Sequence, residues 1–269
     1  MNQTKYELTE QQLSEFARDG YVIVPGLFTQ AETELLERVT EADPRMSTGG
    51  IMKDAEGGES RIWITHAEGE DICNAIARSA RILGPMEQLL GGPTYIWHYK
   101  MMLKEPRVGG AWEWHQDYGY WYGDACLFPN LASCMIAVNK ATRENGCLQV
   151  MKGSNRMGRI DHGMRGGQVG ANLERIEAAE KIMECVYAEL NPGDALFFHS
   201  NTLHRSDQNH SEYARWAFIC CYNAMNNQPY RKNEAHGQAA AAEVWDDDLI
   251  LKYGTRQIEA LTTSVEETP

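Results

Sequence analysis

Two histidines and one aspartate in this sequence have the types and the spacing of ligands to a redox-active metal. His115 and Asp117 are two residues apart, so on an extended segment their side chains would point the same way. His204, far downstream, is the candidate for a second imidazole. Two histidines and one carboxylate on one face of Fe(II) leave its other positions open to a cosubstrate and to O2. These three residues therefore predict a mononuclear iron site.

An arginine follows His204 on a segment that has the composition of a buried strand. Alternation along this strand puts Arg215 on one face with Ala217 and Ile219, and aromatic residues on the other. A buried guanidinium without an anion is strongly destabilising, and guanidinium binds a carboxylate in a fork geometry. We therefore expect a dicarboxylic cosubstrate that is held by Arg215 at one end and chelates the metal at the other.

Helices, turns and one short strand precede these residues. Capping boxes at Thr9 and Thr29 predict helices over about 9–20 and 29–43, with a strand at 21–24 between them. These elements are expected to act as scaffold.

Two further segments separate this scaffold from the candidate ligands. The segment 47–60 is rich in glycine and polar residues, which predicts a mobile loop. Such a loop is either a lid over the site or a plain surface connection. Apolar residues at helical spacing then predict one helix over about 70–90, ended by Gly91 and Gly92.

Beyond residue 92 the apolar residues change from helical to strand-like spacing. Short runs rich in aromatic and β-branched residues, separated by Gly, Pro and Asn, lie at 95–104, 131–139, 147–151, 186–190, 195–199 and 214–222. Many short strands at this spacing predict a sandwich or barrel rather than a parallel sheet with crossover helices. We also expect a partly helical insertion at 166–184, and a helix at the alanines 239–242 beside a solvated acidic run at 246–248.

Composition limits the class of protein and its partners. With 269 residues, 43% of them hydrophobic, the chain is long enough for one large domain. A net charge of −13 argues against nucleic acid and anionic membranes as partners, and favours neutral or cationic small substrates. No apolar run approaches the length of a spanning helix, and the first residues carry no signal-like apolar region. Seven cysteines without a Cys-x-x-Cys pair indicate reduced core thiols, so we expect a cytoplasmic location.

Four stretches of the sequence together resemble one known family. They are Trp114-His115-Gln116-Asp117, the run 144–150 continuing into 153–155, the run 193–199 leading through His204 to Arg215, and the opening at 16–22. They are similar to the phytanoyl-CoA dioxygenase family of Fe(II)- and 2-oxoglutarate-dependent oxygenases, which includes the ectoine hydroxylases. The resemblance implies a mainly β fold with flanking helices, built on a double-stranded β-helix, the cupin-like jelly roll. It implies a single domain over 1–269, with helical support at about 1–92, the jelly-roll core at about 93–225 and a C-terminal tail at 226–269.

The resemblance also implies roles for individual residues. It makes His115, Asp117 and His204 the iron ligands, and Arg215 the partner of the distal carboxylate of 2-oxoglutarate. Positions beside the cosubstrate in the family correspond here to Ser206, Gln116, Met101 and Arg61. Relatives that halogenate carry a small residue in place of the ligand carboxylate, so Asp117 favours oxygen transfer.

Several aromatic residues and one histidine are candidates for substrate contact. Tyr118, Tyr120 and Trp121 follow the metal motif, and they either wall a substrate pocket or pack inside the barrel. His98, on a strand that leads toward the site, is either structural or substrate-facing. His199 is expected to be a satisfied histidine of the core or pocket edge rather than a ligand. Other histidines, His162 among them, are expected on the surface or in loops.

The predicted activity is that of an Fe(II)- and 2-oxoglutarate-dependent dioxygenase of the hydroxylase type. It would use O2 to hydroxylate an unactivated C–H bond of a small molecule and release succinate and CO2, with ascorbate as a candidate reductant. The net charge disfavours an acyl-CoA substrate, so an amino-acid-like, ectoine-like or natural-product substrate is expected. Two alternatives stay open: a cupin-like metal enzyme that does not use 2-oxoglutarate and would not need Arg215, and a noncatalytic member that binds a small molecule. Oligomeric state is not predicted.

Overall fold

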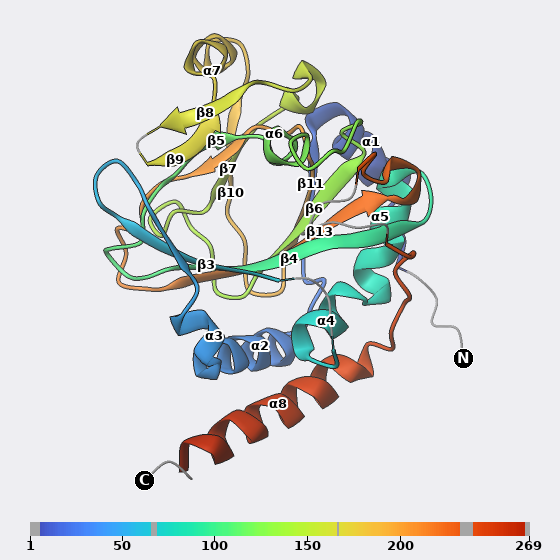
Figure 1. Ribbon diagram of the computed structural model, residues 1–269, viewed down its shortest axis with the longest axis vertical. Coiled ribbons are helices and arrows are strands. Elements are labelled where there is room, and N and C mark those ends of the chain that lie inside the picture. Colours follow the sequence, from blue (N-terminus) through green and yellow to red (C-terminus); the bar gives the residue numbers. More distant parts are fainter. Residues whose placement is uncertain (1–5, 66–68, 166, 232–238, 267–269) are drawn as a thin grey trace.

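Two antiparallel sheets face one another in this protein (Figure 1). The structure, a computed structural model, describes residues 6–65, 69–165, 167–231 and 239–266. The major sheet contains, in spatial order, β1 (Tyr21–Val24), β11 (Ala195–His199), β6 (Leu131–Ala137), β13 (Arg215–Ala224), β4 (Thr94–Lys104), β3 (Glu59–Thr65) and β2 (Gly50–Lys53). The minor sheet contains β10 (Cys185–Ala188), β7 (Leu148–Met151), β12 (His204–Ser206) and β5 (Trp112–His115). A further pair is formed by β8 (His162–Arg165) and β9 (Gln168–Ala171).

The order of the strands is that of a double-stranded β-helix. Strand β6 lies between β11 and β13, and β12 lies between β7 and β5, so strands distant in sequence are hydrogen-bonded neighbours. The pairings within both sheets are antiparallel. Each strand-like run of the sequence beyond residue 92 forms a strand. The predicted jelly roll is therefore confirmed.

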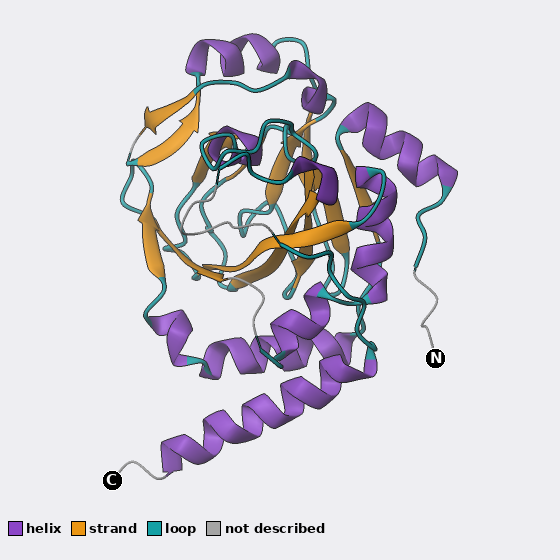
Figure 2. Cartoon of the chain, turned by 45° about the vertical axis from the view of Figure 1, so that its right-hand side comes forward, coloured by secondary structure: helices purple, strands orange, loops and turns teal. Residues whose placement is uncertain are grey.

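Helices cover the outer face of the major sheet (Figures 1 and 2). They are α1 (Glu10–Asp19), α2 (Gln30–Ala42), α3 (Pro44–Ser47), α4 (Ile72–Ala77) and α5 (Ala80–Leu90). Helix α8 (Asp248–Glu266) packs against α2 and α4 on the side away from the sheet. The two predicted capping boxes are present, because Thr9 pairs with Gln12 and Thr29 with Glu32. The remaining helical elements are α6 (Asp117–Trp121), α7 (Leu173–Glu180), η1 (Ser154–Met157) and η2 (Met225–Asn227).

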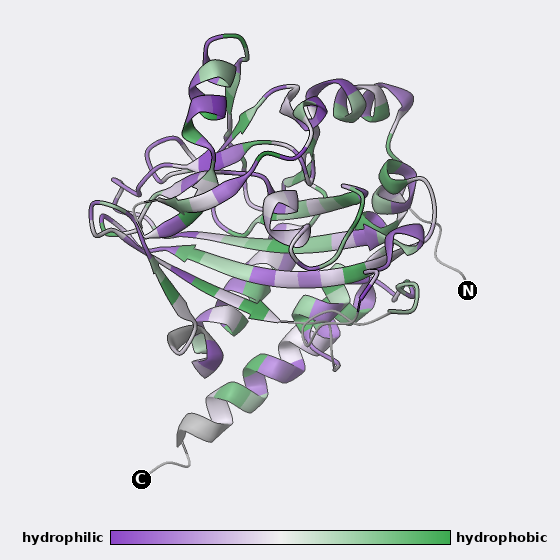
Figure 3. Cartoon of the chain, turned by 45° about the horizontal axis from the view of Figure 1, so that its top comes forward, coloured by the Kyte–Doolittle hydropathy of each residue, from purple (hydrophilic) through white to green (hydrophobic). Residues whose placement is uncertain are grey.

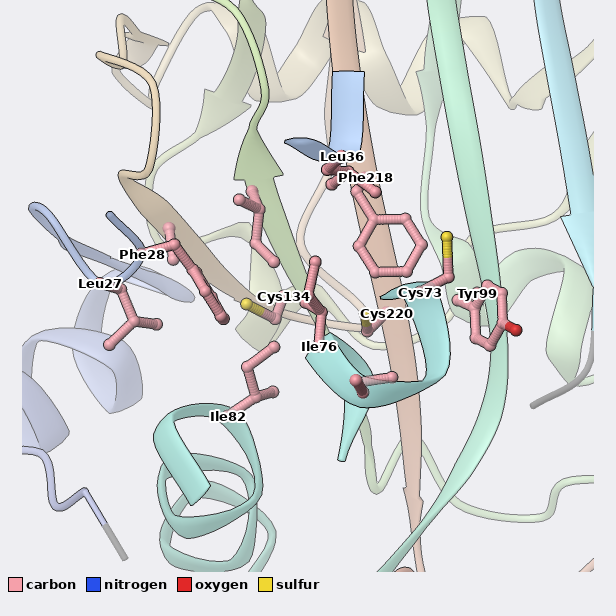
Figure 4. Packing of buried hydrophobic residues seen from close by; sticks show 14 of the residues in the cluster. Leu27, Phe28, Leu36, Cys73, Ile76, Ile82, Tyr99, Cys134, Phe218 and Cys220 are labelled. Atoms are coloured by element: carbon pink, nitrogen blue, oxygen red, sulfur yellow. The ribbon is translucent and has the colours of Figure 1, made fainter. Parts of the chain in front are cut away.

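The main hydrophobic core lies between these helices and the major sheet (Figure 4). Side chains of Phe218 and Cys220 from β13 and of Tyr99 from β4 are buried there with Leu36 of α2 and Ile76 of α4. Burial of one large apolar side chain contributes about 1.5–3 kcal/mol. Because side chains alternate along each strand, the opposite face of the same sheet is free to line a cavity.

The segment 47–60 contains strand and a tight turn, not the open loop that its glycines suggested. It contains β2, which pairs in register with the start of β3. The Asp54 carboxylate closes the turn by accepting hydrogen bonds from the backbone N–H groups of Glu56 and Gly58. The prediction was wrong because turn glycines occur in a tight hairpin as well as in an open loop. The hairpin forms part of the wall of the cavity described below.

Helix boundaries near residue 79 and near the C-terminus also differ from the prediction. The single helix expected over 70–90 is divided into α4 and α5 at Ser79, whose hydroxyl caps α5 and donates to Asp247. The alanines at 239–242 are not helical, and α8 starts at Asp248 inside the acidic run. The spacing of apolar residues gives no information about hydrogen bonds between distant polar side chains. The helix is interrupted at Ser79 because its hydroxyl binds the distant Asp247. The partly helical insertion is confirmed by α7.

The state of the cysteines and the character of the outer helix α8 agree with what the sequence predicted. All seven cysteines are free, and six of them are buried. Hydrophilic and hydrophobic residues alternate along α8 (Figure 3), as expected for a helix with one face against α2 and α4. Within the described ranges, no helix combines the length and the apolar character needed to cross a bilayer.

Candidate metal centre and its pocket

A cavity of about 440 Å³ lies between the two sheets. The major sheet contributes side chains from β3, β4 and β13, and the minor sheet contributes side chains from β5, β7 and β12. Helix α6 closes one edge. Alternate residues in the middle of β4 and at the start of β13 face the cavity: His98, Lys100, Met102, Arg215, Ala217 and Ile219. The walls are therefore mostly apolar, with a few charged groups among them, as in small-molecule sites.

The three predicted metal ligands meet in this cavity. His115 ends β5, His204 begins β12, and the two are paired across the minor sheet. Their ring centroids are 4.1 Å apart. Asp117 Oδ1 lies 4.0 Å from His115 Nε2 and 3.9 Å from His204 Nε2. One ligand atom from each residue falls within 4.8 Å of the others, so the three can share one ion.

Asp117 approaches this point from a helix and not from an extended segment. It is the first residue of α6, whereas His115 is the last residue of β5. Strand alternation was therefore the wrong reason for placing the two side chains together. The turn at Gln116, where strand becomes helix, directs the carboxylate to the histidines instead.

Each histidine presents Nε2 to the common point. Nδ1 of His115 donates to the carbonyl oxygen of Glu113 at 2.7 Å, and Nδ1 of His204 to that of Thr202 at 2.9 Å. A carbonyl can only accept, so Nδ1 carries the proton and Nε2 keeps the lone pair that a metal needs. Burial lowers the pKa of both imidazoles, and the neighbouring His204 lowers the pKa of His115 further. Both rings are therefore in the neutral, ligating form.

Two residues that sequence reasoning did not select hold the Asp117 carboxylate. Ser133 Oγ donates to Oδ2 at 3.0 Å, and the Lys100 ammonium lies 3.5 Å from Oδ1. Burial alone would raise the pKa of Asp117, but the charge of Lys100 and the hydrogen bond from Ser133 hold it below its usual range. The sequence did contain a signal for both residues, because a polar side chain within a buried strand requires a partner.

The donor set fits Fe(II). Two neutral imidazoles and one ionised carboxylate converge from one side, and the cavity leaves the other side open. This is the arrangement in which non-haem Fe(II) keeps positions for cosubstrate and O2.

Arg215 is a buried cation in the same cavity. Among the residues that the structure describes, none forms a hydrogen bond with its Nε. Burial lowers the pKa of the guanidinium to about 10. Ser206, also buried, lines the cavity from the minor sheet. An unpaired buried charge implies an anion that arrives with a ligand, and a carboxylate of 2-oxoglutarate fits that requirement.

Met101 and Arg61 lie on the wrong faces of their strands to contact this ligand. Met101 is buried in the core under the helices, whereas its neighbours Lys100 and Met102 line the cavity. On β3 the cavity receives Ile62, so Arg61 is directed to the other face. Both predicted cosubstrate contacts are wrong in this structure. The resemblance assigned the positions without the strand register, and a shift of one residue reverses the face.

Gln116 and Tyr118 form hydrogen bonds to backbone groups outside the cavity. The buried Gln116 amide donates to the carbonyl oxygens of Gly158 and Asn201, each at 2.8 Å. The buried Tyr118 hydroxyl donates to the carbonyl oxygen of Leu127 at 2.7 Å. Neither side chain lines the cavity, so the predicted cosubstrate role of Gln116 and substrate role of Tyr118 are wrong. Both residues instead brace the turn that carries the ligands.

Tyr120, Trp121 and His98 do line the cavity. The Tyr120 ring centroid is 5.6 Å from that of His115, and the His98 and Trp121 centroids are 5.8 Å apart. Trp112, which was not selected from the sequence, also lines the cavity. Contact of these residues with substrate stays a prediction.

Two other histidines have structural roles. His199 Nδ1 accepts a hydrogen bond from the backbone N–H of Asn201, and burial lowers its pKa to about 4, which agrees with a satisfied core histidine. His162 is not an ordinary loop residue, because its Nε2 accepts from the backbone N–H of Gln116 at 3.0 Å. Its ring lies where a Cβ on Gly119 would approach within 2.1 Å. The missing side chain at Gly119 lets His162 reach the metal-binding turn.

Comparison with known proteins identifies the family. The model of the phytanoyl-CoA dioxygenase family (PhyH) matches residues 16–217. The L-proline trans-4-hydroxylase of Streptomyces griseoviridis is 27% identical over 232 residues, covering 80% of this chain and 86% of that protein. The ectoine dioxygenase of Stutzerimonas stutzeri is 26% identical over 231 residues, covering 79% of this chain and 76% of that protein. Because the family model spans most of the chain, the protein belongs to the phytanoyl-CoA dioxygenase family.

Solved structures agree on the fold. The crystal structure of EctD from S. alaskensis with 2-oxoglutarate and 5-hydroxyectoine is similar with a TM-score of 0.75 and 22% sequence identity. The match covers 91% of this chain and 89% of that one. At this identity the likeness concerns the fold alone, and it supports the jelly roll described above.

Proposed function

We propose that this protein is an Fe(II)- and 2-oxoglutarate-dependent dioxygenase that hydroxylates an unactivated C–H bond of a small molecule, with release of succinate and CO2. One observation carries the proposal. A cluster of two neutral histidines and one carboxylate shares a cavity with Arg215, a buried guanidinium whose Nε is unpartnered within the described residues. The cluster provides for the metal, and Arg215 provides for a second carboxylate on the cosubstrate.

The chain holds and orients the reacting groups in a mostly apolar cavity. Fe(II) held by His115, Asp117 and His204 would activate O2 at the expense of 2-oxoglutarate. The Nδ1 hydrogen bonds fix the imidazole rings, and Ser133 fixes the carboxylate. Arg215 and Ser206 would hold the distal carboxylate of the cosubstrate. Retention of Asp117 as a ligand favours oxygen transfer over halogenation.

The relatives support a small substrate. The matched proteins are named for hydroxylation of L-proline and for oxidation of ectoine, and the cavity of about 440 Å³ suits molecules of that size. We therefore propose an amino-acid-like or ectoine-like substrate in preference to an acyl-CoA. A cupin-like enzyme without 2-oxoglutarate would not explain the buried Arg215, and a noncatalytic binding protein would not explain the complete ligand set.

Composition supports a proposal about the cellular location and the binding partners. Free, mostly buried cysteines suit a reducing compartment, so we propose a cytoplasmic enzyme in which residues 1–269 act as one catalytic domain. The net charge of −13 argues against nucleic acid and membrane partners. Ascorbate is proposed as a reductant.

The test is anaerobic addition of Fe(II) and then 2-oxoglutarate to metal-free protein, followed by visible spectroscopy. Wild type is expected to develop the weak charge-transfer band of a chelated 2-oxo acid, and His115→Ala is expected to lack it. Arg215→Ala should need far more cosubstrate, whereas Arg143→Ala, at an exposed arginine paired with Glu189, should match wild type. Stoichiometric iron without a band would favour the cupin-like alternative, and no iron binding would favour the noncatalytic one.

A further inference from the structure

Lys100 lies beside Asp117 in the cavity, and neither the metal nor the distal carboxylate of 2-oxoglutarate has been assigned to it. We propose that Lys100 recognises the substrate by pairing with a carboxylate, or another acidic group, on a small molecule with an aliphatic body. The inference rests on the proposed function and adds to it the chemical class of the substrate.

Lys100 lies among apolar residues that face the cavity. Strand register places it opposite Ile64 of β3 on one side and Ile219 of β13 on the other, and both isoleucines line the cavity. Its side chain is 14% exposed. The aliphatic stem therefore packs between two isoleucines, and the ammonium reaches the metal centre. An acid with an aliphatic body would find both an ionic partner and apolar contacts here.

The second lysine on this face of β4 shows how a purely structural lysine is satisfied. Lys104 Nζ donates to the carbonyl oxygens of Gly110 at 2.6 Å and of Asp207 at 2.5 Å. Lys100 instead makes one ion pair within the described part of the chain, with Asp117 at 3.5 Å. An ammonium has three donors, so Lys100 retains capacity for a ligand, whereas Lys104 is committed to the backbone.

Lys100 is also distinct from the anion site at Arg215. Arg215 is paired in register with Lys104, and Ile219 with Lys100. Four residues of strand separate the two positions, which corresponds to about 13 Å along the sheet. The backbones of the two residues are therefore well separated, and the two cations enter the cavity at different places. Lys100 lies beside the metal ligand Asp117, whereas Arg215 enters the cavity farther along the sheet.

The loaded site would carry one positive charge in excess. The two charges of Fe(II) are offset by those of 2-oxoglutarate, and the cavity is lined by three further cations, Lys100, Arg205 and Arg215, and by two carboxylates, Asp117 and Asp124. Asp117 Oδ1, which faces Lys100, also faces both imidazoles and would be drawn to the metal. A substrate anion would then compensate Lys100 in a site of low dielectric, where unpaired charge is unfavourable. The overall charge of −13 favoured neutral or cationic substrates, and Lys100 reverses that preference locally.

The test compares acids with their amides on protein loaded anaerobically with Fe(II) and 2-oxoglutarate. The probes are L-proline and prolinamide, and the aliphatic acids butyrate, valerate and hexanoate with their primary amides. Binding is measured by calorimetric titration, so the readout does not depend on turnover. Variants are Lys100→Met, which keeps the length and removes the charge, Lys100→Arg, which keeps the charge, and the control Lys53→Met at an exposed lysine.

At least one acid is expected to bind wild type about 10- to 100-fold more tightly than its amide, the range for a charge-assisted hydrogen bond. Lys100→Met should bind acid and amide equally, while Lys100→Arg and Lys53→Met should keep the preference for the acid. Equal binding of acids and amides by wild type, or no acid binding, would overturn the proposal. So would a Lys100→Met variant that still binds stoichiometric iron but loses the 2-oxoglutarate band, because Lys100 would then hold the cosubstrate. Absence of that band in wild type would instead refute the proposed function.

Discussion

The two faces of the major sheet differ in what covers them: one packs against helices, and the other lines the cavity. On β13, Phe218 and Cys220 point toward the helices into a dry core, while Arg215 and Ile219 point into the cavity. The helix face is filled by protein, and the cavity face keeps charged groups available to ligands. One strand serves both purposes because alternation places sequence neighbours in opposite environments. Stability and ligand binding should therefore be separable between adjacent residues.

The largest expected effect on stability is at Phe218. Phe218→Ala should lower the free energy of unfolding by about 3–5 kcal/mol, because the closed core cannot collapse around the lost ring. Ile219→Ala, one residue along, should cost about 2 kcal/mol, at the low end for such a truncation, because its side chain already borders a cavity. Urea unfolding of both variants measures the difference. Equal losses would mean that the cavity face is packed like the core.

Substitution of Arg215 should stabilise the ligand-free protein, in contrast to substitution of Phe218. Arg215→Met should raise the free energy of unfolding of the ligand-free protein by about 1–3 kcal/mol, because it replaces a buried, unpaired charge with an apolar side chain. Lys104→Met is the contrasting variant and should destabilise, since it removes the donor to the Asp207 carbonyl oxygen and leaves Ser60 as the donor to that of Gly110. Thermal or urea unfolding without metal provides the measurement. Destabilisation by Arg215→Met would show that the guanidinium already has a partner.

His199 places a titratable group near the helix face, beside Phe16. Its pKa is lowered to about 4 by burial. Between pH 4 and about pH 6.5, His199 is therefore protonated in the unfolded chain and neutral in the folded protein. Stability from this group is complete above pH 6.5 and is lost as pH falls, by about 2 kcal/mol at pH 5. His199→Asn keeps an acceptor for the backbone N–H and should flatten this part of the stability curve. If the stability of His199→Asn depends on pH as that of wild type does, the lowered pKa of His199 is contradicted.

Ser133 should give the smallest effect on stability and a clear one on the metal. Ser133→Ala removes the hydrogen bond that orients Asp117, so iron affinity or turnover should fall about 10- to 100-fold, the range for such supporting contacts. Cys134→Ala, one residue along in the helix-side core, should lower stability and leave iron affinity unchanged. Anaerobic iron titration with both variants separates the faces of β6. An unchanged affinity in Ser133→Ala would assign the orientation of Asp117 to its backbone alone.

Much of the scaffold was readable from local sequence. Thr9 and Thr29 marked helix starts because capping depends on residues three apart. The strand-like runs became strands because alternation and β-branched residues act locally. The hairpin at 47–60 and the break at Ser79 were missed because Asp54 and Ser79 have hydrogen-bond partners that are distant in sequence: Ala111 and Gln208 for Asp54, and Asp247 for Ser79.

The chemistry-bearing residues divide in the same way. His115, Asp117, His204 and Arg215 could be selected from residue type and motif alone, and the structure brings them to one cavity. Only the tertiary structure decided that Lys100 rather than Met101 faces that cavity and that Ser133 supports Asp117. The reason is physical: strand register and the pairing of distant strands fix which face a side chain takes, and a one-residue change in register reverses it.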